Sequence, residues 1–571
     1  MITTDNRSPV VAAPGPADPH NDLVRRLVAE AFAHNGDAVG ASSEAAGVSG
    51  LPDIANLERT PSVAETRVPV PPVHPQSPDA GTNSGAPKGG IAEGDTHAFG
   101  EPRCKGNLLQ SRKAGAENAP GATLPKRGQN APVPSSEYYF LRAGEASFRS
   151  PLARATHPQS CSLLPAFDID AVRRDFPALH QEVNGKPLIW LDNAATTHKP
   201  KAVIDATAQF YRRDNSNIHR AAHTLAARAT ELFEAGREKV RQFLGAADAK
   251  EIIFVRGTTE GINLVAQSHG REQIRAGDEI ILTEMEHHAN IVPWQILAKQ
   301  VGAVIRVVPI NDRGELVIGE YAKLLNSKTK MVAVAHVSNA LGTVNPVEEI
   351  IALAHARGVP VLVDGAQSTP HLPVNVQLLD ADFFVFSGHK VFGPTGVGAV
   401  YGKAALLKAM PPWQGGGHMI KDVRFEETVY QEPPEKFEAG TPDIAGVVGL
   451  GAAIDYLMKI GLPAIAAYEH ALLEYATQAL AQVPGLRPIG TAANKASVLS
   501  FVIPGVSNES IAKQLDRQGI AVRAGHHCAQ PSQRHFGLES TVRPSLAFYN
   551  TPQEVDTLVR VLKTLRNSWE S

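Results

Sequence analysis

Short apolar runs alternate with stretches of helical periodicity from about residue 167 onward. The apolar runs predict strands at Glu251–Val255, Glu279–Leu282, Met331–Ala335, Val359–Val363, Asp382–Phe386 and Gly398–Tyr401. Between them, the spacing of apolar positions predicts helices at Ala226–Leu244, Val292–Gln300 and Val347–Ala356. Nearly continuous apolar strands separated by helices are typical of a parallel sheet covered on both faces. This region is therefore predicted to be an α/β domain.

Beyond residue 445 the pattern changes to longer helices and shorter strands. Helices are predicted at Ala445–Ile460 and Tyr468–Leu480, strands at Ala496–Ile503 and Ala521–Arg523, and a closing helix from Pro552. This order predicts a small α+β domain. We assign residues 190–445 to a large domain, and residues 166–189 and 446–571 to the small one.

The first 165 residues have a different character. They are rich in Pro, Gly, Ala and Ser, and all four tryptophans lie beyond them. Such a segment cannot bury enough apolar surface to offset roughly 1–2 kcal/mol of backbone entropy per residue, so we predict a disordered leader. Short apolar islands interrupt it at Asn21–Phe32, Gly50–Leu57 and Tyr138–Leu141. They are either chance clusters in a linker or docking sites for a partner, and we favour docking.

Composition excludes several classes of protein. The formal net charge of −3 and the pI of about 6.7 do not indicate a general nucleic-acid binder. No apolar run approaches the roughly 20 residues of a membrane helix, and the N-terminus lacks the order of a secretory signal. The three cysteines, Cys104, Cys161 and Cys528, show no paired spacing, which argues against disulfides and against zinc or iron–sulfur sites. We expect a cytoplasmic protein.

Two residues at predicted strand ends indicate cofactor chemistry. Asp364 ends the run Val361-Leu362-Val363, and Lys390 follows the run that ends at Phe386. Ligands of parallel sheets bind beyond the carboxyl ends of the strands, where both residues fall. A lysine that forms a Schiff base and an acid that pairs with a pyridinium nitrogen are the parts of a pyridoxal phosphate site. Each residue alone could also be an ordinary surface charge. The polar residues predicted around them therefore decide whether a cofactor site is indicated.

Polar residues suited to the rest of such a site follow other predicted strands. The turn Gly257-Thr258-Thr259 opens a predicted helix and can bind a phosphate, to which Ser387 and His389 can add contacts. His287 and His288 are adjacent, so their side chains diverge, and no third metal ligand follows at the usual spacing. A histidine stacked on the cofactor ring fits better, although a structural pair stays open. Gln367 and Asn339 follow strands and can donate hydrogen bonds to the cofactor or the substrate.

Two arginines and one cysteine lie in the predicted small domain. Arg523 and Arg543 can clamp an amino-acid carboxylate, or they are surface charges. Cys528 lies in Arg523-Ala524-Gly525-His526-His527-Cys528, a loop-like segment whose basic neighbours favour the nucleophilic thiolate. A catalytic role and an ordinary buried cysteine are both consistent with this pattern.

Taken in series, these motifs resemble the type II, SufS-like cysteine desulfurases of the fold-type I pyridoxal phosphate enzymes. The resemblance covers about residues 166–570, and its most specific segments are Leu191–Thr197, Met285–Trp294, Val363–Ser368, Ser387–Gly396 and Arg523–Pro531. It implies an enzyme that converts L-cysteine to L-alanine and transfers the sulfur to its own cysteine as a persulfide.

The resemblance also implies a role for each site residue. Lys390 carries the cofactor, Asp364 pairs with its ring nitrogen, and Gln367 contacts its phenolic oxygen. His287 stacks on the ring, and Thr259, Ser387 and His389 contact the phosphate. Asn339 and Arg543 bind the substrate carboxylate, and Cys528 receives sulfur. From their positions in the sequence alone, we add Thr258 to the phosphate contacts and Arg523 to the substrate contacts. Thr441 matches a threonine that reaches the phosphate in the partner subunit, so a homodimer is implied.

The leader departs from the ordinary type II pattern. It resembles the leaders of cysteine desulfurases packaged in encapsulin shells, so residues 1–165 are expected to bind a shell and to place the enzyme in a sulfur-storage compartment. Three alternatives stay open: a SufE-dependent sulfur donor for iron–sulfur cluster assembly, a selenocysteine lyase, and a C–S lyase that releases sulfide directly.

Overall fold

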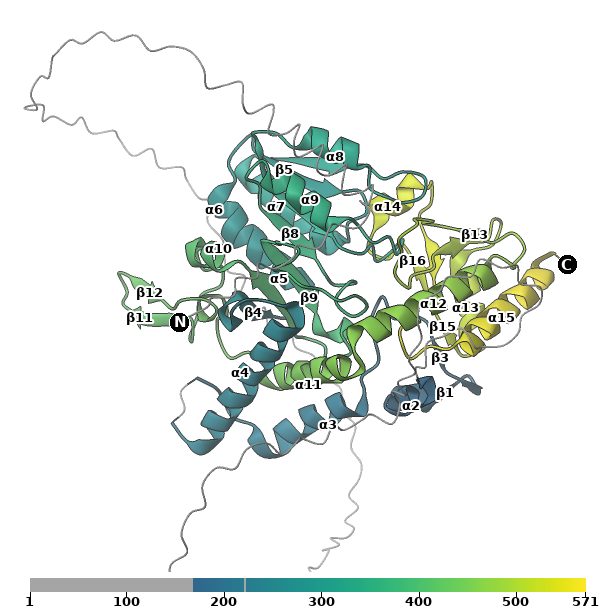
Figure 1. Cartoon of the computed structure of the whole chain (residues 1–571), viewed down its shortest axis with the longest axis horizontal. Helices are drawn as coiled ribbons and strands as arrows, with labels where there is room; N and C mark the ends of the chain where they lie inside the picture. The colour runs from purple at the N-terminus through teal and green to yellow at the C-terminus, as the bar shows by residue number, and fades with distance from the viewer. Residues whose placement is uncertain (1–167, 220–221, 571) are drawn as a thin grey trace, which may run out of the picture. The chain divides into compact units, whose positions relative to one another are not determined.

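The central element is a seven-stranded sheet, drawn in teal and green among helices of the same colours in Figure 1. The computed structural model describes residues 168–219 and 222–570, so the predicted leader, its apolar islands, Cys104 and Cys161 lie outside the described residues. The strand order is β4-β10-β9-β8-β7-β5-β6. The strands are β4 (Ile252–Val255), β5 (Glu279–Thr283), β6 (Val304–Val308), β7 (Thr329–Ala335), β8 (Val361–Asp364), β9 (Phe383–Ser387) and β10 (Gly398–Gly402).

This sheet confirms the predicted α/β architecture. Strands β9, β8, β7, β5 and β6 run parallel, and only β10 runs antiparallel, between β9 and β4. The six predicted strands appear within two residues of their expected starts. The seventh strand, β6, was not predicted, because it lies at the sheet edge and most of its residues are exposed or half-buried rather than continuously apolar.

Alternate side chains of the strands enter two separate apolar cores. One core receives Val332, Val334, Phe384 and Phe386, and the other receives Met331, Ala333, Phe383 and Val385. Both faces of the sheet are therefore buried, which explains why its central strands are apolar without alternation. Helices α5 (Thr258–Val265) and α7 (Val292–Val301) contribute to the second core, whereas α4 (Thr224–Leu244), α9 (Val347–His355) and α11 (Ile444–Ile460) contribute to the first.

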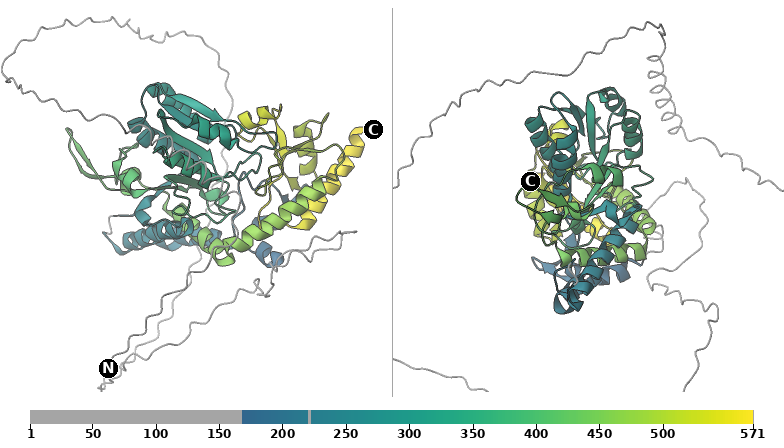
Figure 2. Two further views of the ribbon diagram at one scale, coloured as in Figure 1. Left: turned by 45° about the horizontal axis from the view of Figure 1, so that its top comes forward. Right: turned by 90° about the vertical axis from the view of Figure 1, so that its left-hand side faces the viewer.

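A four-stranded antiparallel sheet forms the C-terminal part of the described chain (Figure 2, yellow). Its order is β13-β14-β17-β16, with β13 (Arg487–Pro488), β14 (Phe501–Val502), β17 (Thr541–Arg543) and β16 (Arg523–Gly525). Helices α12 (Leu462–Leu480), α13 (Asn508–Asp516) and α15 (Pro552–Glu570) pack beside it, and α14 (Gln530–His535) follows Cys528.

Two strand predictions in this region were wrong. The expected strand Ala496–Ile503 is regular only over Phe501–Val502, because the preceding backbone bonds to loops: Ala496 N–H donates to Gly342 O, and Leu499 N–H donates to Pro544 O. The expected strand Ala521–Arg523 is divided at Val522. Before it, β15 (Ile520–Ala521) pairs in parallel with β3 (Ile189–Trp190), and after it, β16 pairs with β17.

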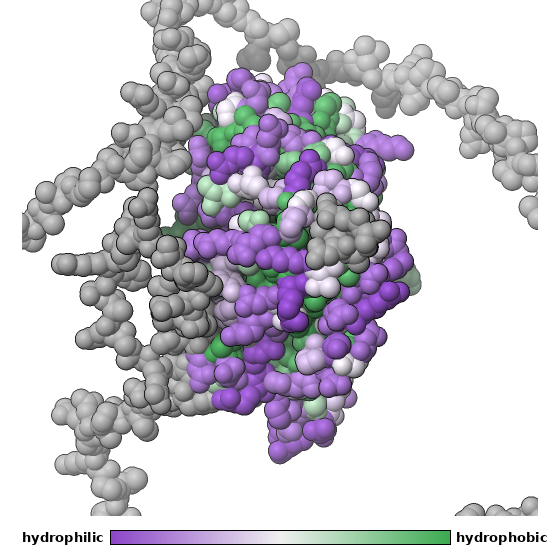
Figure 3. Space-filling model, turned by 90° about the vertical axis from the view of Figure 1, so that its right-hand side faces the viewer, coloured by the Kyte–Doolittle hydropathy of each residue, from purple (hydrophilic) through white to green (hydrophobic). Residues whose placement is uncertain are grey.

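The remaining elements are shorter or peripheral. They are α2 (Ile169–Arg174), β1 (Glu182–Val183), β2 (Lys186–Pro187), α3 (Lys201–Gln209), α6 (Arg271–Gln273), α8 (Ile318–Leu324), α10 (Ala404–Ala409), β11 (Ile420–Val423) and β12 (Thr428–Tyr430). The face shown in Figure 3 is mainly polar, with hydrophobic residues in small groups. Among the described residues no single helix is both long and apolar enough to span a membrane, although α11 and α12, bent by 76°, pass that test as a pair.

Candidate active site

One cavity of about 230 Å³ lies beyond the carboxyl ends of the parallel strands. It collects every site residue predicted from the sequence except Thr441: Thr258, Thr259, His287, Asn339, Asp364, Gln367, Ser387, His389, Lys390, Arg523, Cys528 and Arg543. These residues come from seven separate segments of the chain. Their convergence follows from topology, because parallel strands end at the same edge of the sheet.

Asp364 and Lys390 form the charged centre of the cavity. Asp364 is the last residue of β8, and Lys390 ends the 3₁₀ turn Gly388–Lys390 that follows β9. Lys390 retains some accessible surface because it faces the cavity, yet desolvation lowers its pKa to about 8, against the opposing attraction of Asp364. Burial raises the pKa of Asp364, while the Ala366 N–H and Lys390 oppose that shift. The pair therefore combines a reactive amine with a carboxylate held away from water.

A glycine lets backbone and hydroxyl groups converge at the start of α5. A Cβ on Gly257 would lie 3.0 Å from Ser387 Oγ, and Gly257 has a φ of +149° that other residues rarely adopt. Ser387 Oγ accepts from Thr258 N–H at 2.9 Å and also lies 2.9 Å from Thr258 Oγ1. The helix begins at Thr258, within the turn that the sequence predicted to open it. Unpaired N–H groups and the positive end of the helix dipole at this position suit an anion.

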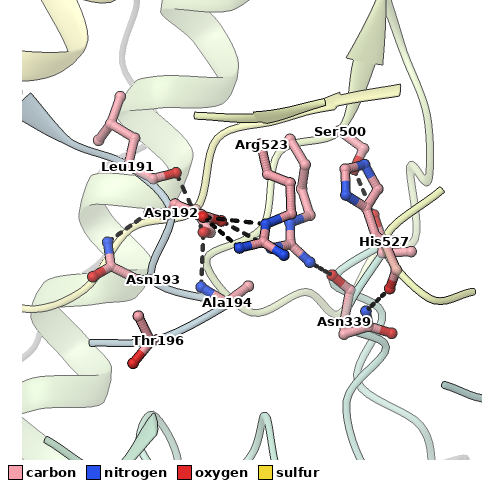
Figure 4. A network of polar contacts seen from close by, with 12 residues as sticks. Leu191, Asp192, Asn193, Ala194, Thr196, Asn339, Ser500, Arg523 and His527 are labelled. Carbon is pink, nitrogen blue, oxygen red and sulfur yellow. Dashed lines mark hydrogen bonds and ion pairs between the residues drawn. The ribbon is translucent and has the colours of Figure 1, made fainter. Parts of the chain in front are cut away.

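The two predicted arginines share one acidic partner. Arg523 donates to Asp192 Oδ2 at 3.0 Å and Arg543 donates to Asp192 Oδ1 at 3.1 Å; Figure 4 shows the Arg523 side chain directed at Asp192. Arg543 is buried, its Nη1 donates to Asn339 O at 2.9 Å, and its Nε has no partner among the described residues. Burial lowers the pKa of Arg543 to about 10, although Asp192 opposes the shift. The surface-charge interpretation therefore fails for Arg543.

His287 and Asn339 both line the cavity. Desolvation, reinforced by Lys390, lowers the pKa of His287 to about 3, so the ring is neutral, and its Nδ1 accepts from Ala289 N–H at 3.0 Å. Asn339 Nδ2 donates to His527 O at 2.6 Å, as Figure 4 shows. Gln367 Nε2 donates to Ala194 O at 2.6 Å. These contacts fix the three side chains at the cavity edge.

Cys528 lies in a turn of unusual backbone conformation. His527 and Cys528 both have left-handed φ angles, +53° and +55°, which cost non-glycine residues of order 1–3 kcal/mol each. Cys528 N–H donates to His526 Nδ1 at 3.0 Å, and Cys528 O accepts from His288 N–H at 2.7 Å. The turn keeps the half-buried thiol on the wall of the cavity that contains Lys390.

Thr441 is not brought to this cavity within one chain. It lines a different hollow together with Arg256, Trp413 and Glu438, and Asn217 Nδ2 donates to its hydroxyl at 3.4 Å. Its predicted role depends on a second subunit and stays a prediction.

Sequence reasoning missed two acids that organise the site. Asp192 was noted only as part of a motif, although it holds both arginines. Glu286 is buried next to His287 and accepts from Thr283, Asn290 and Ala335, and burial raises its pKa to about 7. Glu286 could have been found from the sequence, because it directly precedes the candidate residue His287. Asp192 could not, because 331 residues separate it from Arg523 and no local pattern links the two.

Comparisons with known proteins agree with this geometry. The family model described as aminotransferase class-V matches residues 189–558. A cysteine desulfurase of Synechococcus elongatus is 62% identical over 400 residues, which make up 70% of this chain and 64% of that protein. A probable cysteine desulfurase of Vibrio cholerae is 50% identical over 395 residues, 69% of this chain and 98% of that protein. The chain thus spans less than two thirds of the longer relative and nearly all of the shorter one.

A solved structure extends the likeness to three dimensions. The crystal structure of the cysteine desulfurase CsdA of Escherichia coli, in an S-sulfonic acid form, matches with a TM-score of 0.66 and 42% identity over 70% of this chain and 99% of that one. The predicted fold-type I architecture is confirmed. The chain belongs to the aminotransferase class-V family.

Proposed function

We propose that this protein is a cysteine desulfurase that converts L-cysteine to L-alanine and transfers the sulfur to Cys528 as a persulfide. The observation that carries the proposal is the single cavity that holds Lys390, Asp364 and Cys528 together. An aminotransferase of the same fold needs the first two residues but has no use for the cysteine.

Pyridoxal phosphate is the cofactor, and the residues present fit it. Lys390 is the amine for covalent attachment and Asp364 the carboxylate for the ring nitrogen, with the neutral His287 ring beside them. Thr258, Thr259, Ser387 and His389 line the same cavity and would hold the phosphate, and Gln367 would donate to the phenolic oxygen. When bound, the cofactor supplies an electron sink that stabilises negative charge at the substrate Cα.

Arg543 and Asn339 orient the substrate. The Arg543 guanidinium is already held by Asp192 and Asn339 O, so it binds a carboxylate with little loss of side-chain freedom. Arg523, which is half exposed, reaches the same Asp192 from the open side of the cavity. In this proposal the substrate carboxylate binds at the arginines and its thiol faces Cys528, which lines the same cavity.

Lys390 and Cys528 divide the remaining chemistry. Lys390 would move the Cα proton of the bound substrate, for which its lowered pKa of about 8 is suited near neutral pH. The Cys528 thiolate attacks the substrate sulfur, so an S–S bond forms as the Cβ–S bond breaks. The electron pair of the broken bond goes to Cβ, which takes up the proton given up by the Cys528 thiol and becomes the methyl group of alanine.

The test is alanine and sulfide production from L-cysteine, with a reductant, by the wild type and by Cys528→Ser. We expect the variant to lose at least 100-fold in turnover while its cofactor absorbance remains. Normal turnover by Cys528→Ser would contradict the persulfide step and favour a lyase that releases sulfide directly. Selenocysteine tested in parallel separates the selenocysteine lyase alternative, because its cleavage does not require the thiol.

We further propose that the enzyme is of the SufS-like type II and that residues 1–165 load it into an encapsulin shell. The proposal is supported by the short segment between Arg523 and Cys528 and by the family match, which starts only at residue 189. Co-expression of residues 166–571 with the candidate shell tests the loading. We expect turnover to persist and loading to be lost; retained loading would refute the proposal, and dependence on a SufE-like acceptor is measured in the same preparations.

A further inference from the structure

Two histidines outside the proposed mechanism lie next to the cysteine nucleophile. His288, His526 and Cys528 each present one possible ligand atom, and these atoms all lie within 4.8 Å of one another. His288 comes from the loop after β5, whereas His526 and Cys528 come from the segment after β16. The cluster therefore exists only because the fold brings two distant segments together.

Backbone hydrogen bonds hold the two segments in register. His288 N–H donates to Cys528 O at 2.7 Å, and Gln530 N–H donates to His288 Nε2 at 3.3 Å. Cys528 N–H donates to His526 Nδ1 at 3.0 Å, and the centres of the His288 and His526 rings are 5.5 Å apart. Each imidazole thus accepts a backbone hydrogen bond at one ring nitrogen. Within the described part of the chain, its second ring nitrogen remains available to another ligand.

The chemistry of the three side chains selects the class of ion. Two imidazoles and a thiolate are the ligands that Zn²⁺ and other borderline or soft ions prefer, and no carboxylate in the cluster favours Mg²⁺ or Ca²⁺. Zinc bonds of about 2.0–2.3 Å put tetrahedral ligand atoms roughly 3.3–3.8 Å apart. The three ligand atoms already lie within 4.8 Å of one another, and the exposed His526 ring is free to rotate towards that spacing.

We propose that His288, His526 and Cys528 form a Zn²⁺ site that reversibly caps the Cys528 thiolate, with water as the fourth ligand. Binding releases the thiol proton and forms a Zn–S bond, so a capped Cys528 cannot attack the substrate sulfur. The binding itself is independent of the proposed function, and only its inhibitory effect rests on it.

Zinc binding is measured first, by competition with a chromophoric chelator, on the full-length, cofactor-loaded protein without a histidine tag and with a phosphine reductant. We expect one equivalent of Zn²⁺ per chain and at least a tenfold loss of affinity in Cys528→Ser, His288→Ala and His526→Ala. His470→Ala, which removes an exposed histidine elsewhere, and the double variant Cys104→Ser/Cys161→Ser are the matched controls and keep the affinity. Co²⁺ in place of Zn²⁺ should give the intense visible bands of a tetrahedral site with thiolate, absent in Cys528→Ser.

The second experiment measures inhibition of alanine formation by Zn²⁺. We expect EDTA to restore activity and His526→Ala to raise the half-inhibitory Zn²⁺ concentration at least tenfold, measured against its own activity without zinc. Unchanged affinity in Cys528→Ser, or the absence of an equivalent of bound Zn²⁺, would overturn the zinc site. Loss of the desulfurase activity itself would leave the binding arm intact, so the failures of the two proposals are distinguishable.

Discussion

At the scale of single residues, the site depends on charges that are fixed before any ligand arrives. Asp192 accepts from both Arg523 and Arg543, and it does so from the segment that directly follows β3. Because Arg543 is buried, removal of its acidic partner leaves a guanidinium that is both uncompensated and less well oriented. If the arginines bind substrate as proposed, Asp192 is a positioning residue for that binding.

Asp192→Asn is expected to raise KM for L-cysteine about tenfold, equivalent to about 1.4 kcal/mol, with a smaller change in kcat. The asparagine keeps the size of the side chain but removes its charge. Steady-state kinetics of alanine formation measure the effect, and the exposed Asp312→Asn is the control. A fall in kcat with an unchanged KM would show that Asp192 does not act through the substrate carboxylate.

The lowered pKa of Lys390 has a consequence for cofactor attachment. Covalent attachment needs the neutral amine, whose fraction increases as the pH rises through the pKa. With a pKa of about 8, the rate of reconstitution of the apoenzyme should rise from pH 6 and level off above about pH 8.5. Absorbance after mixing with pyridoxal phosphate follows the rate. A rate that still climbs steeply at pH 10 would mean that burial does not lower this pKa.

At the scale of elements, a buried ion pair connects α4 to the segment that carries Thr441. Arg237 donates to both oxygens of Glu438, at 2.7 and 2.9 Å, and Glu438 Oε1 also accepts from Phe254 N–H in β4. Both side chains are only 2% exposed. The pair thus joins a helix, a strand and a loop at one point.

Glu438→Ala should lower the free energy of unfolding by about 3–5 kcal/mol, because it removes the buried carboxylate that accepts from two Arg237 nitrogens and leaves only the half-exposed Glu234 as an ionic partner. The double variant Arg237→Met/Glu438→Leu should recover most of that loss. Chemical denaturation followed by circular dichroism compares them, with the exposed pair variant Lys201→Ala/Asp205→Ala as the control, expected to change by less than about 1 kcal/mol. An equal loss in both Glu438 variants would indicate a packing defect rather than a poorly compensated buried charge.

Elements with a strong local pattern could be predicted from the sequence, and those defined by tertiary pairing could not. The central strands are apolar on both faces, so β7 and β9 were found, whereas β6 is half-exposed and was missed. Val522 separates two strands that belong to different sheets, and no local pattern encodes this change of pairing partner.

The site residues show the same difference. Lys390, Asp364 and Cys528 were found from local motifs, but the cluster of His288, His526 and Cys528 was not. The sequence analysis looked for a third metal ligand at a short spacing from His288, whereas His526 and Cys528 are distant in sequence and lie near His288 only in the folded chain.

At the scale of the whole molecule, the position of Thr441 predicts that a complete site needs two chains. Thr441 does not line the cavity of its own Lys390. If it serves the partner's cofactor, a heterodimer of one Lys390→Ala chain and one Thr441→Ala chain contains one intact site and one doubly damaged site.

Such a heterodimer should show about half of the wild-type activity, with wild-type affinity for pyridoxal phosphate at its single working site. Differently tagged chains allow its purification, and the two homodimeric variants are the controls. If Thr441 acts in its own chain, the only site that retains Lys390 lacks Thr441, and the heterodimer shows the weakened cofactor affinity of the Thr441→Ala homodimer.

The contact between Asp192 and Arg523 also sets the order of events during synthesis. A ribosome adds roughly 5–20 residues per second, so the 331 residues that separate these side chains take on the order of 15–70 s to make. Throughout that interval β3 has no β15 to pair with and Asp192 has no arginine to hold. The nascent chain can complete its central sheet before then, yet the cavity lacks part of its wall until the segment from Arg523 to Arg543 has been made. A ligand that needs this whole set of side chains can therefore bind only after that segment has emerged and folded back onto the sheet.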